Sequence, residues 1–151
     1  MFKATSDPKR PTIAPKTEDS PPHLNFAPYE NALAKLTEAA GRYRAAAAAG
    51  SPNSETSQTL GPVNAKLRNA ERRLLDDAGL PGRSWYRHLL YAPGVYSGYD
   101  VKTVPAVREA IEGKRWSEAD AEIVRVSRAL DSMASLVREA AEGLGSARAG
   151  R

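Results

Sequence analysis

Apolar residues recur at helical spacing through the C-terminal third of the chain. The interval between them alternates between four and three residues in the series Ala119, Ile123, Val126, Leu130, Met133, Val137, Ala140 and Leu144. This heptad stripe predicts one long helix, which begins near Ser117-Glu118-Ala119-Asp120, a sequence that resembles a capping box. A helix with one apolar stripe gains most of its stability from packing, so we expect it to lie against other helices.

Two more long helices are predicted upstream. The first runs from about Pro28 to Ala49, and its apolar stripe consists of Leu33, Leu36, Ala40 and Tyr43. The second begins at Gly61-Pro62 and ends at Gly79 and Pro81, and its stripe consists of Val63, Leu67, Ala70 and Leu74. A short third helix, from about Pro105 to Glu112, completes the set. These elements predict an all-α fold, an up-and-down four-helix bundle.

The two ends of the chain differ from this helical part. Residues 1–28 hold six of the eleven prolines, which predicts an extended, polyproline-like arm or linker over residues 1–27. The helical domain then spans residues 28–144, and the small and polar residues 145–151 predict a flexible tail. Three apolar residues lie beside the heptad stripe and form either a broader core face or a second face for self-association: Val124, Ala134 and Leu136.

Half of the aromatic residues lie in a long loop between the second and third helices. Five of the ten Phe, Trp and Tyr residues fall between Trp85 and Tyr99. Such a loop either fills a core or presents a surface to another molecule. Its second half carries Tyr96, Tyr99 and Lys102 around Gly98. Two phenol hydroxyls and an ammonium can bind a carboxylate, but the rings can equally pack across the end of the bundle while Lys102 is solvated.

Composition narrows the classes of function. The net charge is +4, but the basic residues alternate with acidic ones, which favours solvated helix surfaces over a nucleic-acid interface. A basic helical nucleic-acid-binding module stays as the alternative. No run approaches the ~18 apolar residues of a membrane helix, so no membrane contact is expected. The N-terminal residues lack the apolar region of a signal peptide, although the chain can still be a piece of an exported protein.

Catalytic signatures are weak. The chain has no cysteine, and neither His23 nor His88 has neighbours at metal-ligand spacing. No nucleophile elbow or phosphate-binding glycine loop occurs. We therefore expect no catalysis and no cofactor in this chain. A stand-alone enzyme that uses His88 and the loop tyrosines is a third hypothesis.

One stretch closely resembles a known family motif. It reads Gly79-Leu80-Pro81-Gly82-Arg83-Ser84-Trp85-Tyr86-Arg87-His88-Leu89-Leu90-Tyr91-Ala92-Pro93. It resembles the Gly-Leu-Pro…Tyr-Arg-His…Tyr-Ala-Pro motif of the transferrin-receptor-like dimerisation domain, the C-terminal helical domain of glutamate-carboxypeptidase-like zinc peptidases. Its positions in the motif are Tyr86, Arg87, His88, Tyr91 and Pro93. The resemblance extends over about residues 20–144.

The resemblance implies a bundle that mediates homodimerisation and a loop that closes over the substrate site of a catalytic domain. In the glutamate-carboxypeptidase-like members, a Lys-Tyr pair on this loop holds a substrate carboxylate. Tyr99 falls at the Tyr position, Gly98 stands at the Lys position, and Lys102 is the candidate to replace the charge. The zinc ligands belong to the catalytic domain. The implied partners are a second copy and the catalytic domain of the longer parent protein, which is expected to be exported.

Overall fold

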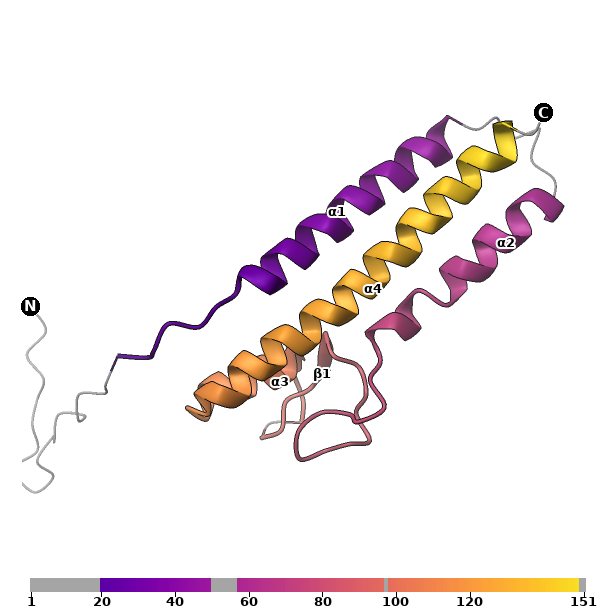
Figure 1. The fold of residues 1–151 in the computed structure, drawn as a ribbon. Coiled ribbons are helices and arrows are strands. Elements are labelled where there is room, and N and C mark those ends of the chain that lie inside the picture. The colour runs from indigo at the N-terminus through magenta and orange to yellow at the C-terminus, as the bar shows by residue number, and fades with distance from the viewer. Residues whose placement is uncertain (1–19, 50–56, 97, 150–151) are drawn as a thin grey trace, which may run out of the picture.

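The computed structural model describes residues 20–49, 57–96 and 98–149, and most of them are helical (Figure 1). Three long helices lie side by side: α1 (Ala27–Ala48), α2 (Ser57–Arg68) and α4 (Trp116–Ala149). A single 3-10 turn, η1 (Glu71–Leu74), follows α2, and a short helix, α3 (Pro105–Glu112), precedes α4. None of the helices described is both long and apolar enough to cross a membrane.

The heptad stripe of α4 forms the centre of the fold, as predicted. Its residues Ile123, Val126 and Leu130 are each at most 2% exposed, and Ala140 and Leu144 are also buried. Beside the stripe, Ala134 and Leu136 are buried, whereas Val124 is 38% exposed. The broader-core interpretation is therefore confirmed for Ala134 and Leu136 but not for Val124.

The ends of α4 differ from the prediction. The helix begins at Trp116, so Ser117 lies inside its first turn and does not cap it. Arg115 precedes the helix and binds the carboxylate of Glu118 at 2.9 Å. The C-terminal end of α4 reaches Ala149, so residues 145–149, expected in the tail, are helical.

The apolar face of α1 is rotated from the predicted one. Ala32 and Ala39 are the buried residues of α1, and Leu36 and Tyr43 pack at the edge of the core. Leu33, predicted to face the core, is 45% exposed. Alanine has a small side chain, so α1 approaches α4 closely along its Ala32–Ala39 line, which leaves the larger Leu33 outside. The predicted stripe for α1 was therefore wrong at Leu33.

The second helix is shorter than predicted at its C-terminal end. It begins at Ser57, contains Pro62 in its interior and ends at Arg68. The amides of Asn69 and Ala70 bond to carbonyls only three residues earlier, and the Asn69 side chain donates to the carbonyl of Ala65. These bonds tighten the helix and end it. The apolar series nevertheless continues, because Leu74 of η1 is buried in the same core as α4.

The direction of the helices differs from a regular bundle. Tyr43 and Ala46 near the end of α1 share an apolar cluster with Ala140 and Leu144 near the end of α4, so α1 and α4 run in the same direction. Lys66 of α2 binds Glu139 of α4, whereas Leu74 of η1, later in the chain, packs in the cluster with Val126 and Leu130, nearer the start of α4. The chain from α2 to η1 therefore runs antiparallel to α4. The three long helices alternate in direction, and α3 has eight residues and is short, as predicted. In an up-and-down bundle of four helices the first and fourth helices are antiparallel, so the parallel α1 and α4 do not confirm the predicted topology. The fold is a mostly helical packing of four helices.

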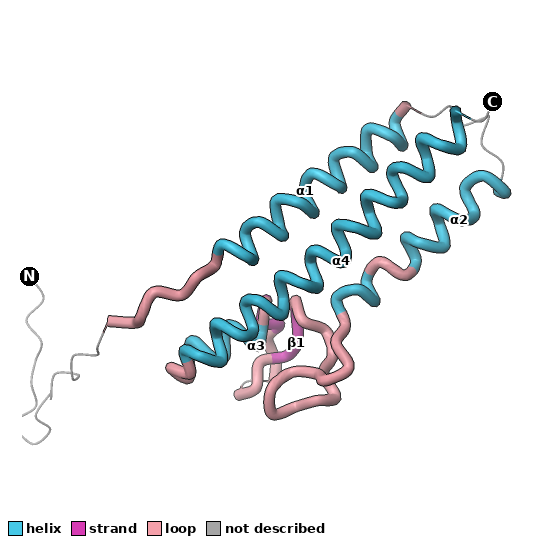
Figure 2. The backbone as a smooth tube through the Cα atoms, viewed as in Figure 1, coloured by secondary structure: helices cyan, strands magenta, loops and turns pink. Residues whose placement is uncertain are grey.

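The aromatic segment contains a small sheet that the all-α prediction missed. Strands β1 (Tyr91–Pro93) and β2 (Val101–Thr103) pair antiparallel, with Ala92 opposite Lys102 (Figure 2). Each strand has three residues, too few to show an alternating pattern in the sequence. The hairpin fixes both ends of the segment 94–100 and positions the candidate site.

Candidate functional site

The loop region between η1 and α3 begins with a tight turn. Gly79 has φ +67°, and a Cβ placed there would lie 2.2 Å from the carbonyl oxygen of Ser84. The amide of Leu80 donates to the carbonyl of Tyr86 at 2.8 Å, and the Leu80 side chain is 2% exposed. Only glycine fits the backbone at position 79, and Leu80 anchors the turn in the core. This explains the Gly-Leu-Pro start of the motif.

His88 joins the loop region to η1. Its Nδ1 accepts the amides of Leu90 at 3.2 Å and Tyr91 at 3.3 Å, and its ring stacks on that of Tyr91 at 3.8 Å between centroids. Because Nδ1 accepts two hydrogen bonds, the proton of the neutral ring lies on Nε2. Nε2 is 3.4 Å from Oε1 of Glu71, close enough for attraction but without the geometry of a hydrogen bond.

Tyr91 completes this cluster. Its hydroxyl donates to Oε1 of Glu71. This bond, followed by the smaller effect of His88, lowers the pKa of Glu71, and Glu71 in turn raises the pKa of Tyr91. The hydrogen bond between Tyr91 and Glu71 joins β1 to η1. The arrangement gives His88 a structural role and offers no support for a stand-alone enzyme that uses it.

The remaining motif residues lie nearer the surface. The ring of Tyr86 lies under the guanidinium of Arg83 at 5.3 Å and 6.2 Å from the ring of Trp85. Arg87 binds Asp77 at 3.1 Å, but both side chains are more than half exposed, so this pair contributes little to stability. Pro93 ends β1, and its carbonyl accepts a hydrogen bond from Arg83.

Sequence reasoning assigned no role to the most buried ion pair of the region. Arg83 Nη2 donates to Oε1 of Glu109 at 2.7 Å, and both side chains are below 10% exposed. The two residues are 26 positions apart and come from different elements. The charges of Arg83 and Glu109 are ordinary in the sequence, and no spacing rule connects them, so no sequence signal could have identified the pair.

A second ion-pair network holds the start of the loop region on α4. Arg125 donates to Asp76 at 2.8 Å, to the carbonyl of Gly79 at 2.7 Å and to Glu122 at 3.2 Å. The hydrogen bond from Arg125 lowers the pKa of Asp76. Asp76 also accepts the amide of Ala78, so this carboxylate orders the turn that leads to Gly79.

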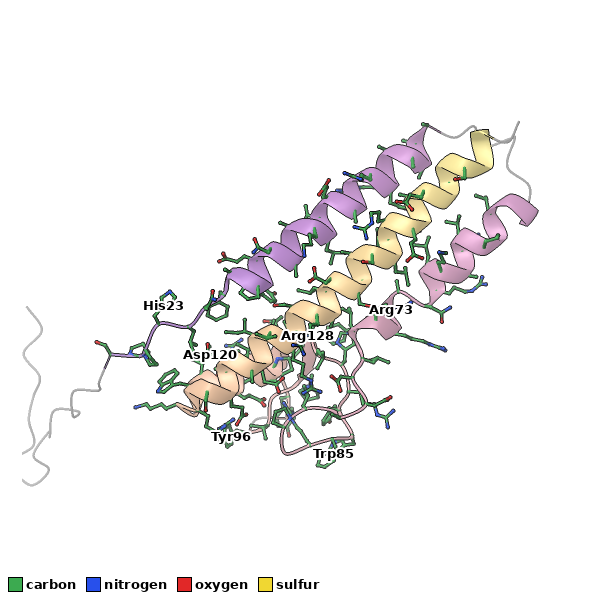
Figure 3. The ribbon with its side chains drawn as sticks, in the orientation of Figure 1. His23, Arg73, Trp85, Tyr96, Asp120 and Arg128 are labelled. Carbon is green, nitrogen blue, oxygen red and sulfur yellow. The ribbon has the colours of Figure 1, made fainter. Side chains whose placement is uncertain are left out.

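The three predicted substrate-binding residues occupy two different places. Tyr96 is 86% exposed and Tyr99 is 97% exposed, on either side of Gly98, which has φ +66°. Figure 3 shows Tyr96 and Trp85 at the outer edge of the loop region, away from α1 and the C-terminal part of α4. Lys102 instead lies on β2, where its ammonium binds Glu112 of α3 and lowers the pKa of that carboxyl. The structure therefore associates Lys102 with α3 and leaves the two tyrosines at an exposed tip.

The described residues contain no group of three His, Cys, Asp or Glu side chains placed to hold a metal ion. His23 lies on the arm before α1, far along the chain from the loop region that holds His88 (Figure 3). What the loop region presents to its surroundings is a set of exposed rings on a base held by buried polar contacts. Such a surface is suited to contact with another molecule.

Comparison with known proteins assigns most of the chain to one family. Residues 24–138 match the transferrin receptor-like dimerisation domain. A probable glutamate carboxypeptidase of Arthroderma benhamiae is 30% identical over 109 residues, which cover 72% of this chain and 15% of that protein. A probable glutamate carboxypeptidase of Arabidopsis thaliana is 42% identical over 75 residues, 45% of this chain and 11% of that protein.

An inactive zinc metalloprotease of Schizosaccharomyces pombe is 38% identical over 75 residues, 50% of this chain and 9% of that protein. The chain thus spans only a small part, between 9% and 15%, of the length of these relatives. The domain is one that occurs in glutamate-carboxypeptidase-like zinc peptidases. Because the match covers residues 24–138 of a chain of 151 residues, the chain belongs to the transferrin receptor-like dimerisation domain family.

Proposed function

We propose that this chain is the homodimerisation domain of a glutamate-carboxypeptidase-like zinc metallopeptidase. The observation that carries the proposal is the family match over residues 24–138, together with relatives named as glutamate carboxypeptidases. The zinc would belong to the catalytic domain of the parent protein, and this chain would not be catalytic alone. Its partners would be a second copy of itself and that catalytic domain.

Within this proposal, residues 94–100 form a substrate loop that closes over the catalytic domain. The support is the exposure of Tyr96 and Tyr99, whose rings and hydroxyls have little protein around them. Their hydroxyls would donate hydrogen bonds to a substrate carboxylate. Lys102, whose charge is engaged by Glu112, would support the base of the loop from β2.

Light scattering on a size-exclusion column tests the dimerisation part. We expect a mass twice that of the protomer, both for this chain at rising concentration and for the parent protein. A parent protein that remains monomeric at high concentration would contradict the proposal. A monomeric isolated chain beside a dimeric parent would show that the dimer contact needs the catalytic domain.

Peptidase kinetics of the parent protein test the substrate-loop part. The Tyr99→Phe variant should raise KM about tenfold for peptides with a free C-terminal carboxylate, because it removes one hydrogen bond to a charged group. Peptides with an amidated C-terminus should show no such difference. Tyr43→Phe, a half-buried tyrosine of α1, is the control. Equal KM values for Tyr99→Phe and the unaltered protein would refute a substrate contact by Tyr99.

A further inference from the structure

We infer that the buried pair Arg83–Glu109 positions the substrate loop, of which the structure describes residues 94–96 and 98–100. The inference rests on the proposed function, because it gives the pair its role through that loop. Arg83 also lies over the ring of Tyr86, but Arg83 and Glu109 reach the substrate loop through its backbone. They act as positioning residues, through the backbone on both sides of Gly94.

The pair holds the backbone on each side of Gly94. Before it, the carbonyl of Pro93 accepts a hydrogen bond from Nη1 of Arg83. After it, the amide of Val95 donates to Oε1 of Glu109 at 3.0 Å. The same Oε1 accepts Nη2 of Arg83 at 2.7 Å, so the two contacts are coupled through one ion pair. A shift of either charged side chain therefore moves the start of the loop.

Gly94, which lies between the two backbone groups bound by the pair, closes the loop with two hydrogen bonds. The amide of Gly94 donates to the carbonyl of Asp100 at 3.0 Å, and the carbonyl of Gly94 accepts the amide of Gly98 at 3.1 Å. Gly94 is buried, whereas Tyr96 and Tyr99 are almost fully exposed. The tip thus has little packing of its own, and the place of its rings depends on where Gly94 is held.

The burial of the charges agrees with a positioning role. Arg83 and Glu109 are 5% and 9% exposed, and burying two charges costs free energy that their attraction often only offsets. An apolar pair of similar volume would serve the core as well. It would not bind the carbonyl of Pro93 and the amide of Val95. Glu109 belongs to α3, and α3 packs on α4. The ion pair therefore connects the start of the loop to the helical part of the molecule.

Amide hydrogen exchange of this chain, followed by NMR, tests the inference directly. In Glu109→Gln we expect the amides of Val95 and Gly98 to exchange about tenfold faster, in line with the loss of a charged hydrogen-bond partner. The amides of Leu89 and Val104, which bond to Leu74 and Leu90, should exchange as before. Glu38→Gln, an exposed carboxylate paired with Arg42 on α1, is the control.

A second variant distinguishes loss of loop positioning from unfolding of the whole chain. Arg83→Met combined with Glu109→Gln removes both charges, so no unpaired charge is left in the core. We expect this double variant to keep its helical circular dichroism while the loop amides again exchange faster. Unchanged exchange at Val95 and Gly98 in a folded double variant would overturn the inference.

Kinetics of the parent protein separate this inference from the proposed function. Glu109→Gln should raise KM for peptides with a free C-terminal carboxylate by a larger factor than it lowers kcat. Faster loop exchange with an unchanged KM would support the positioning role and refute the role of the loop in substrate binding. Slow loop exchange with a raised KM would refute positioning by the pair.

Discussion

At the scale of single residues, the loop region depends on a few positions whose contacts are specific to one residue type. Gly79 lies against the backbone of Ser84, and Asp76 accepts hydrogen bonds from both Arg125 and the amide of Ala78. Each has a near neighbour of the same residue type without the same contacts. Gly82 and Asp77 therefore serve as matched controls for the contacts of Gly79 and Asp76.

The Gly79→Ala variant should be much less stable than Gly82→Ala. Both glycines have a positive φ, +67° and +71°, which costs an alanine about 1–2 kcal/mol. A Cβ at position 79 would also lie 2.2 Å from the carbonyl oxygen of Ser84, whereas one at position 82 meets nothing within 4 Å. Urea unfolding should show a loss of about 1 kcal/mol for Gly82→Ala and at least about 3 kcal/mol for Gly79→Ala. Equal losses would show that the turn adapts.

The contribution of Asp76 to stability should depend on pH. Arg125 lowers the pKa of Asp76 in the folded state below its ordinary value of 3.8, so the folded state binds this proton less readily than the unfolded state. The stabilisation is therefore complete above the ordinary pKa and is lost as the pH falls through the lower folded pKa.

Asp76→Asn should cost about 1–2 kcal/mol at neutral pH, since the carboxylate is about one-third exposed. The difference from the unaltered chain should shrink in urea unfolding below pH 4. Asp77→Asn, with a side chain 99% exposed, should lose little at either pH. A pH-independent loss for Asp76→Asn would argue against the ion pair as its cause.

At the scale of elements, α4 organises the molecule. Both apolar clusters include residues of α4, and α1, α2, η1 and α3 all pack on it. The heptad stripe of α4 could be predicted because its period is a local property of the sequence. The buried face of α1 could not be predicted in this way, because two series of residues at helical spacing compete, one that begins at Leu33 and one that begins at Ala32. The close approach of α1 to α4 selected the series with the small residue.

Two adjacent residues of α4 test this assignment. Ile123 is 1% exposed and Val124 is 38% exposed. Ile123→Ala should lower the free energy of unfolding by about 3 kcal/mol, because it removes buried methyl groups and leaves a cavity. Val124→Ala should change it by less than about 1 kcal/mol, since alanine also favours the helix. Similar losses in thermal unfolding would mean that Val124 is covered, as it would be in a second face for self-association.

At the scale of the whole molecule, ion pairs join the helices and offset much of the positive charge. Lys35 of α1 binds Asp131 of α4 at 3.0 Å, and Lys66 of α2 binds Glu139 of α4. Arg125 of α4 binds Asp76, beyond η1. The basic residues thus alternate with carboxylates in space as they do in the sequence. A nucleic-acid interface would need cations gathered on one face.

We therefore expect no appreciable affinity for nucleic acid. Fluorescence anisotropy of a labelled DNA duplex and of a labelled single strand should stay constant as this chain is added at low salt. A basic module would instead bind at low salt and lose affinity steeply as salt is raised. Such a salt-dependent rise in anisotropy would revive the nucleic-acid-binding alternative.

The sequence alone determined the helical class of the fold, the course of α4, the short helix α3 and the loop motif between Gly79 and Pro93. These features depend on periodicity and on turn residues, which act over a few positions. Only the tertiary structure decided that β1 pairs with β2, that Lys102 binds Glu112, and that Arg83 meets Glu109. Each of those contacts joins residues eight or more positions apart, and the path of the chain between them is fixed by packing on α4.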